Sequence, residues 1–372
     1  MLIGVPLETA ASDTRVAVTP ETAKKLMAQG HQLFVQAGAG LKASAPDAAY
    51  AAVGAEIVDA KAAFGRDLVL KVRSPSVEEI ALMKRGATVV GMLNPFDHEG
   101  LERLAAAGLT SFALEAAPRT TRAQSMDVLS SQANIAGYKA VIIAADRYQK
   151  FFPMLMTAAG TVKAARVVIL GVGVAGLQAI ATAKRLGAVI EASDVRPSVK
   201  EQVESLGAKF IDVPYETAEE KEAAEGVGGY ARPMPESWLA RQRAEVAKRV
   251  AAADVVISTA LIPGRPAPKL VSAEMVQSMK PGSVIVDLAA ANGGNCALTQ
   301  PGQTVLQHGV TIVGEMNLPA LVAADASALY ARNVLDFLKL ILPKDAAAVH
   351  VPLDDDIVAA CLMTQGGRVK RS

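Results

Sequence analysis

Three glycines at the spacing Gly-x-Gly-x-x-Gly follow an apolar run at residues 167–170 and precede a helical pattern. In such a turn Gly171 permits the sharp reversal from strand to helix, Gly173 lets a pyrophosphate approach bare backbone, and Gly176 lets the helix pack closely on the strand. Phosphates then accept hydrogen bonds from N–H groups at the positive end of the helix. The motif therefore predicts a phosphate-binding turn.

An acidic residue stands where the next predicted strand ends. Residues 188–193 form that strand, and Asp194 follows it, eighteen residues after Gly176. A carboxylate at this position accepts hydrogen bonds from ribose hydroxyls, whereas a 2′-phosphate would meet like charge. Strand, glycine turn, helix and terminal acid together favour a dinucleotide site over an ordinary glycine-rich turn, and they predict a preference for NAD(H).

A second polar cluster lies at residues 118–130 of an otherwise apolar chain. Arg119 and Gln124 can donate hydrogen bonds to a carboxamide oxygen, and Asp127 can accept from a carboxamide nitrogen. A nicotinamide carboxamide offers both groups, so this cluster is a candidate for binding the reactive end of a cofactor. Short polar residues also cap helices, and Ser125 or Asp127 is suited to cap the helix that follows. From the residues alone the two interpretations are comparable.

The composition bounds the class of protein. A length of 372 residues suggests about two domains. Hydrophobic residues make up 51% and aromatic ones only 4%, which indicates cores of Ala, Val, Ile and Leu, as in parallel sheets covered on both faces. With 38 basic against 37 acidic residues the net charge is +1, so no electrostatic basis for nucleic-acid binding is present.

The sequence also predicts a compartment. Cys296 and Cys361 are too few for a disulfide framework, and residues 1–10 lack the basic start and apolar run of a signal peptide. The uncharged run 167–183 contains three glycines and is shorter than the ~20 residues of a spanning helix. We therefore expect a cytoplasmic chain without direct membrane insertion, and no metal site is predicted.

Apolar runs that alternate with helical patterns predict two α/β domains, each a Rossmann-like, doubly wound parallel sheet, separated by a cleft. Strands are predicted at 2–5, 33–35, 68–72, 87–93 and 110–114 in the first domain, and from 165, at 188–193, 209–212, 254–258, 283–287 and 310–313 in the second. Helices are predicted at 20–29, 77–84, 100–107, 130–147 and 326–342.

Two of these helices define the expected domains. The helix at 130–147 is expected to lead from the first domain into the second. The helix at 326–342 carries an apolar stripe, and we expect it to end the ordered chain and to pack on the first domain. The stripe consists of Tyr330, Val334, Phe337, Leu338 and Ile341. The predicted domains are residues 1–130 with 320–372, and residues 131–319, the dinucleotide-binding one.

Residues 213–241 form a long polar stretch, with glycines on both sides of Tyr230. Such a composition fits a mobile flap over a site and a disordered surface loop equally well.

Taken together, the chain resembles the NAD(H)-binding α subunit, or domain I, of proton-translocating nicotinamide nucleotide transhydrogenase. The similarity runs from Arg15 almost to the C-terminus. Its most specific segments are Arg-Ala-Gln-Ser-Met-Asp at 122–127, residues 171–186, Lys-Glu-Gln-Val-Glu-Ser-Leu-Gly at 200–207, Thr-Ala-Leu-Ile-Pro-Gly at 259–264 and Gly-Gly-Asn-Cys at 293–296.

The resemblance implies a set of site residues. Arg119, Gln124, Asp127 and Ser130 would hold the nicotinamide end, and Tyr230 would close over bound nucleotide. The remaining nucleotide contacts are expected from Gly171, Gly173, Val174, Ala175, Gly176, Asp194, Val195, Arg196, Ala260 and Leu261.

The resemblance also implies partners. The chain would form a homodimer that docks on membrane-spanning subunits, and so associate peripherally with the cytoplasmic (inner) membrane. It would pass hydride between NADH and NADP+, coupled to proton translocation by the membrane subunits. No second glycine fingerprint is visible, so NADP(H) is expected only on a domain carried by a partner chain.

Alanine dehydrogenase is the related alternative, because it shares the two-domain fold and several motifs. Oxidising an amino acid needs acid and base groups beside the substrate, whereas hydride exchange between two nicotinamides needs none. Arg15 and Lys71 match the dehydrogenase's substrate positions, but residues 91–94 lack its histidine and Ala291 replaces its aspartate. His98 fits a solvated residue at a helix start. A non-catalytic NAD-sensing module is the third alternative.

Overall fold

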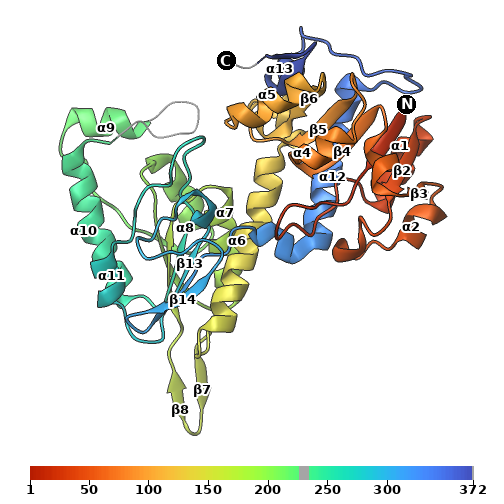
Figure 1. Ribbon diagram of the computed structural model, residues 1–372. Coiled ribbons are helices and arrows are strands. Elements are labelled where there is room, and N and C mark those ends of the chain that lie inside the picture. Colours follow the sequence, from red (N-terminus) through yellow and green to blue (C-terminus); the bar gives the residue numbers. More distant parts are fainter. Residues whose placement is uncertain (226–233, 371–372) are drawn as a thin grey trace. The chain divides into compact units, whose positions relative to one another are not determined.

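The computed structural model describes residues 1–225 and 234–370 (Figure 1). The chain divides into two compact units, the first comprising Met1–Gln132 and Pro319–Ser372, and the second Ala133–Leu318. Both are α/β folds built on mainly parallel sheets, which confirms the predicted fold class. The unit boundary after Gln132 lies inside helix α6 (Val128–Arg147).

Among the described residues, the first unit forms a sheet in the order β3-β2-β1-β4-β5-β6-β16-β17. The order of its six parallel strands is that of doubly wound dinucleotide folds. The strands are β1 (Leu2–Val5), β2 (Gln32–Gln36), β3 (Glu56–Val58), β4 (Leu68–Arg73), β5 (Thr88–Met92), β6 (Thr110–Ala113), β16 (Leu362–Gln365) and β17 (Arg368–Val369). The helices, besides the start of α6, are α1 (Pro20–Ala28), α2 (Asp47–Ala52), α3 (Ala60–Phe64), α4 (Val77–Ala81), α5 (His98–Ala106), α12 (Ala323–Ile341) and α13 (Asp356–Cys361).

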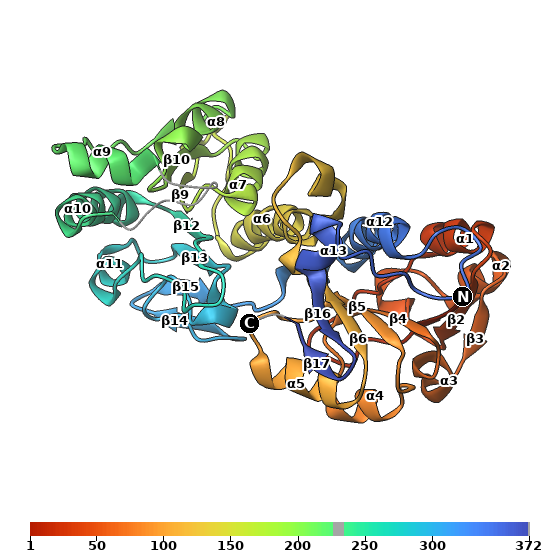
Figure 2. The same ribbon diagram turned by 90° about the horizontal axis from the view of Figure 1, so that it is seen from above.

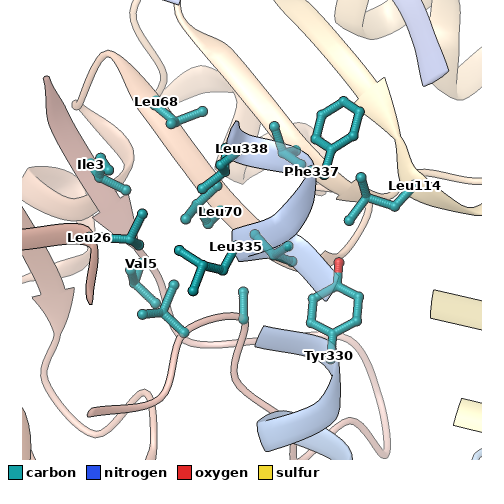
Figure 3. Packing of buried hydrophobic residues seen from close by; sticks show 14 of the residues in the cluster. Ile3, Val5, Leu26, Leu68, Leu70, Leu114, Tyr330, Leu335, Phe337 and Leu338 are labelled. Carbon is teal, nitrogen blue, oxygen red and sulfur yellow. The ribbon is translucent and has the colours of Figure 1, made fainter. Parts of the chain in front are cut away.

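Helix α12 packs its apolar stripe on one face of this sheet. The five residues of the predicted stripe are all buried. Figure 3 shows Leu335 and Leu338 beside Leu70 of β4. The rings of Phe337 and Phe112, the latter on β6, lie with their centroids 5.5 Å apart. A C-terminal helix thus supplies a large part of the first unit's core.

The expectation that α12 ends the ordered chain is wrong. Helix α13 and strands β16 and β17 follow it, and β16 pairs antiparallel with β6. Met363 is buried, and the Thr364 hydroxyl donates to the carbonyl of Leu109 at 2.8 Å. These strands are too short for a clear alternation of apolar residues, and their partner strand lies about 250 residues earlier, so their pairing is decided only in the folded chain.

The second unit holds a sheet in the order β11-β10-β9-β12-β13-β15-β14, again with the doubly wound arrangement and with an antiparallel edge strand. The strands are β9 (Arg166–Leu170), β10 (Val189–Ser193), β11 (Lys209–Phe210), β12 (Val255–Ser258), β13 (Val284–Asp287), β14 (Thr304–Gln307) and β15 (Val310–Val313). The helices, besides the rest of α6, are α7 (Val174–Arg185), α8 (Lys200–Ser205), α9 (Ala218–Glu225), α10 (Glu236–Ala252) and α11 (Ala273–Ser278).

Alternate residues of β9 face opposite sides of this sheet. Val167 and Ile169 pack with α6, α7 and α8, whereas Val168 and Leu170 pack with α10 and α11. Figure 2 shows these two groups of helices on the two sides of the strands. Burial on both faces explains why the strand reads as a continuous apolar run. Among the described residues no helix is long and apolar enough to cross a membrane.

The predicted polar loop at 213–241 is partly helical, which corrects the sequence interpretation. It contains α9 and the start of α10, separated by residues 226–233. Trp238 of α10 is buried, stacks on Tyr215 with ring centroids 5.9 Å apart, and donates its indole N–H to the carbonyl of Val213 at 3.3 Å. One buried indole therefore orders a stretch whose composition is mostly charged. Tyr230, the proposed flap residue, lies outside the described residues.

A separate antiparallel hairpin, β7 (Leu155–Thr157) and β8 (Gly160–Val162), was not predicted. It follows α6 and extends as an arm beyond the rest of the second unit (Figure 1).

Candidate functional site

The glycine turn between β9 and α7 has the steric features expected of a tight phosphate-binding turn. Gly171 has a φ of +93°, which favours glycine. A Cβ on Gly176 would lie only 2.0 Å from the carbonyl oxygen of Gly171, so any side chain there would push the helix away from the strand. A Cβ on Gly173 would meet no atom within 4 Å, so this side of the turn is open.

Two more features of the turn come from the neighbouring strand and from the helix. The hydroxyl of Thr259, just after β12, donates to the carbonyl of Gly171 at 2.9 Å. Val174 and Ala175 form the first turn of α7, where helix geometry leaves the backbone N–H groups without intrahelical partners. The turn therefore presents donors to whatever lies in front of it.

Asp194 directly follows β10, at the carboxyl end of the sheet, as predicted. Its Oδ2 accepts a hydrogen bond from the N–H of Val172 in the glycine turn at 2.7 Å. Arg196 donates from Nε to Oδ1 and from Nη2 to Oδ2, both at 2.9 Å. Burial raises the pKa of Asp194, but the hydrogen bonds and charge of Arg196 outweigh it and lower the pKa below its ordinary value. The carboxylate is therefore ionised at neutral pH and ties the strand end to the turn.

The segment 259–264, which follows β12, is held by a buried amide that sequence reasoning did not single out. Asn295 accepts from the N–H of Ala260 at 3.1 Å and donates to its carbonyl at 2.9 Å, as well as to the carbonyl of Pro268 at 2.8 Å. Leu261, next in the chain, is half exposed. Asn295 belongs to the Gly-Gly-Asn-Cys segment at 293–296, which was the only signal for it.

Val195 departs from the other predicted contacts. Its side chain packs against the small apolar cluster that includes Val213, Ala224 and Trp238, so its contribution to the described structure is packing.

The polar loop of the first unit is anchored from two sides. Ala123 and Met126 are buried in the core, and the carbonyl of Ser125 accepts a hydrogen bond from Nδ2 of Asn333 at 2.7 Å. On the outer side Arg122 donates to both carboxylate oxygens of Asp355, at 2.6 and 2.8 Å. It also pairs with Asp356. The loop is thus held by α12 and α13, elements that lie more than 200 residues later in the chain.

Asp127 caps helix α6, which decides one of the open questions from the sequence. Its Oδ1 accepts from the N–H of Ser130 at 2.9 Å, and its Oδ2 accepts from the Ser130 hydroxyl at 2.6 Å. Arg119 and Gln124, by contrast, are exposed on the loop. Capping uses Asp127 and Ser130, and it leaves the Gln124 side chain at the surface.

Arg15 and Lys71, the positions that match a dehydrogenase substrate site, are buried and paired with acids of the same unit. Arg15 donates to both oxygens of Asp13, at 2.9 and 2.5 Å. The Lys71 ammonium lies 3.0 Å from Oε1 of Glu79 and 3.5 Å from Oε2 of Glu8. Burial opposes ionisation of Asp13, but the hydrogen bonds from Arg15 hold its pKa well below the usual range.

The predicted site residues therefore fall into two groups. The glycine turn, Asp194, Arg196 and Ala260 meet at the carboxyl ends of β9, β10 and β12 in the second unit. Arg119, Gln124, Asp127 and Ser130 share one loop of the first unit. His98 is an exposed residue at the start of α5, as expected. Within the described ranges, no group of three or more acidic, cysteine or histidine side chains is arranged to hold a metal ion.

Comparison with known proteins places this geometry in a family. Residues 4–136 match the family described as "Alanine dehydrogenase/PNT, N-terminal domain", and residues 140–372 match "Alanine dehydrogenase/PNT, C-terminal domain". The chain is 49% identical over 377 residues to an NAD(P) transhydrogenase subunit alpha chain of Rhodospirillum rubrum, covering 99% of this chain and 97% of that one. It is 30% identical over 381 residues to alanine dehydrogenase of Bacillus subtilis, covering 99% and 92%.

Solved structures agree with these relatives. The crystal structure of transhydrogenase from Sinorhizobium meliloti superposes with a TM-score of 0.90 at 47% identity, covering 99% of this chain and all of that chain. An L-alanine dehydrogenase superposes with a TM-score of 0.81 at 29% identity, covering 99% and 96%. The chain therefore belongs to the alanine dehydrogenase/PNT family and is an oxidoreductase subunit of the NAD(P) transhydrogenase alpha type.

Proposed function

We propose that this chain binds NAD(H) and passes hydride between it and NADP(H) held by a partner chain, with membrane-spanning partner subunits coupling the exchange to proton translocation. In that assembly the chain would associate peripherally with the cytoplasmic membrane. The observation that carries the proposal is the glycine turn with Asp194 bound to its backbone, in a chain 49% identical to a transhydrogenase alpha subunit.

The residues of the second unit fit a dinucleotide. The open side of Gly173 leaves room for a pyrophosphate to approach the backbone, and the first turn of α7 offers N–H donors with a favourable helix dipole. Asp194, at the end of the adjacent strand, is ionised and suited to accept hydrogen bonds from a ribose. Ala260 and Leu261, beside the turn, would bound the same site.

The first-unit loop would position the reactive end. Bound NAD(H) supplies the nicotinamide carbon that gives or accepts hydride. Gln124 and Arg119, exposed on the loop, would donate to the carboxamide, while Asp127 and Ser130 fix the loop's register against α6. These residues orient a group and hold it, and none is assigned a proton transfer. Orientation and proximity are then the protein's contribution to the rate.

Alanine dehydrogenase activity is expected to be absent, because Arg15 and Lys71 are already paired with Asp13, Glu79 and Glu8. A substrate carboxylate would have to displace buried ion pairs, which is costly. The test has two arms. Incubation with alanine and NAD+ should give no pyruvate, and mixing with an NADP(H)-loaded transhydrogenase domain should give hydride exchange with an NAD analogue.

Steady pyruvate formation at ordinary enzyme rates would put the dehydrogenase first. NADH binding with no turnover in either arm would instead favour a non-catalytic NAD-sensing module.

We also propose that the chain forms a homodimer, and that the β7–β8 arm contributes to it. Met154 and Met156 of the arm are 62% and 71% exposed, and an isolated two-stranded hairpin is marginally stable in water. A hollow of about 490 Å³ lies at the base of the arm, lined by Phe151, Phe152 and Leu186 among others. An apolar arm beside an apolar hollow suits a twofold pairing, in which each copy offers both surfaces.

The change Met156→Asp should convert the dimer to a monomer or weaken it by at least tenfold, because it places a charge in an apolar contact (about 1–3 kcal/mol per copy). Sedimentation velocity at several concentrations measures this. Leu306→Asp, on the exposed edge strand β14, is the matched control and should leave the dimer intact. A dimer that survives Met156→Asp unchanged would remove the arm from the interface.

A further inference from the structure

We infer that Asn333 of helix α12 is a positioning residue for the loop that carries Gln124, acting through the backbone of Ser125. The inference rests on the proposed function, because it assigns a role to a residue that would touch neither nucleotide. It concerns the first unit alone.

Asn333 is a polar residue on the buried side of an otherwise apolar helix. Its neighbours on that side, Tyr330, Val334 and Phe337, belong to the core, and its own side chain is 8% exposed. A buried amide is costly unless its donor and acceptor atoms are both used. Here both are, since Nδ2 donates to the carbonyl of Ser125 at 2.7 Å and Oδ1 accepts from the hydroxyl of Ser131 at 2.7 Å.

The Asn333 amide is the last member of a buried hydrogen-bonded chain. Arg15 donates from Nη1 to Oε1 of Gln132 at 2.8 Å, and Nε2 of Gln132 donates to the Ala326 carbonyl at 3.1 Å and to the Ser131 hydroxyl at 3.4 Å. Asp13 holds Arg15 in turn. Each partner restricts the orientation of the next, so the face that Asn333 presents to the loop is determined by the whole chain.

This arrangement gives Arg15 a role other than binding substrate. The guanidinium has its charge satisfied by Asp13, and its remaining donor sets the amide of Gln132. The segment that Asn333 holds is a 3₁₀ turn, Thr121–Met126, which has poorer hydrogen-bond geometry than an α-helix. A side-chain donor on the carbonyl of Ser125, the residue after Gln124, therefore restrains the turn at its exposed point.

The deciding experiment compares Asn333→Asp, Gln124→Met and the double variant in the full chain at pH 8. The Asp side chain keeps the size of Asn but sets an acceptor against the Ser125 carbonyl. We expect single-turnover hydride transfer to an NADP+-loaded partner domain to slow by roughly 10- to 100-fold, the scale of lost geometric control. The Kd for NADH should change less than about twofold, because the contacts of the glycine turn remain.

The double variant should be no slower than Gln124→Met alone, since a residue that acts through Gln124 has nothing left to position. Additive losses would mean that Asn333 acts by another route, and would overturn the inference. Amide hydrogen exchange of residues 121–127 is the readout that does not depend on activity. It should accelerate at least tenfold in Asn333→Asp, and unchanged exchange overturns the inference as well.

Two further variants protect the test against a simple folding defect. Ser131→Ala removes only the hydroxyl that orients the Asn333 amide, places a good helix former in α6, and should slow transfer by roughly two- to tenfold. Arg332→Gln, the exposed neighbour that pairs with Glu21, should change neither rate nor exchange. If Gln124→Met slows transfer and Asn333→Asp does not, the inference fails alone. If the unmodified chain transfers no hydride, the proposed function fails, and hydrogen exchange still decides the role of Asn333.

Discussion

Replacing Asp194 with alanine is expected to weaken NADH binding by roughly 10- to 150-fold, which corresponds to about 1.5–3 kcal/mol for two hydrogen bonds to a charged acceptor. The same change should improve NADPH binding relative to NADH. In the unmodified chain Arg196 is paired with Asp194, and the variant leaves the guanidinium without that carboxylate. A 2′-phosphate would then meet a cation where it now meets an anion.

Isothermal titration with NADH and NADPH measures both effects. Asp194→Asn is an informative intermediate, because it keeps an acceptor for the N–H of Val172 while removing the charge. Asp212→Ala, an acid beyond β11 that pairs with Lys200 at the surface, is the matched control and should leave both affinities unchanged. Equal affinities of the unmodified chain for the two nucleotides would contradict the assignment of Asp194 to the ribose.

Replacing Gln124 with methionine is expected to slow hydride transfer by one or two orders of magnitude while leaving NADH affinity and dimerisation nearly intact. Methionine keeps the length of the side chain and loses its hydrogen bonds. The nicotinamide would then be bound but poorly oriented, and misplacement by about 1 Å costs roughly 100-fold in rate. Affinity is expected to survive because the phosphate and ribose contacts come from the second unit.

Single-turnover mixing with an NADP+-loaded partner domain separates this rate from nucleotide binding. Ser125→Ala is the matched control, since Ser125 is exposed in the same loop and is held through its carbonyl oxygen. A rate unchanged within error in Gln124→Met would return the loop to a purely structural role, in which Asp127 caps α6 and nothing more.

The elements that hold the proposed nucleotide site were predictable because their signals are local. The apolar run of β9, the glycines that follow it and the acid after β10 are close in sequence, and each predicted strand is present within two residues of its expected bounds. Helix α1 was equally readable. Thr19 caps it and Pro20 takes its first position, where a missing N–H is harmless.

Elements that depend on distant partners were missed. Strands β16 and β17 form only against β6, and α10 is ordered by burying Trp238 against Tyr215. The polar composition of residues 213–241 predicted a loop, because charged residues at the surface of a helix and in a loop look alike without knowledge of the buried side. The uses of Asn295 and Asn333 were missed for the same reason, since their partners lie 27–35 and 202–208 residues away.

The sequence by itself determined the α/β class, the glycine turn, the acid beside it and the resemblance to transhydrogenase α subunits, since each rests on residue types at short spacing. Only the tertiary structure decided which polar residues are already engaged. Asp127 caps a helix, Arg15 is neutralised by Asp13, and Arg196 pairs with Asp194. The physical reason is that a buried polar group takes its role from the partner that satisfies it, and folding can bring that partner from anywhere in the chain.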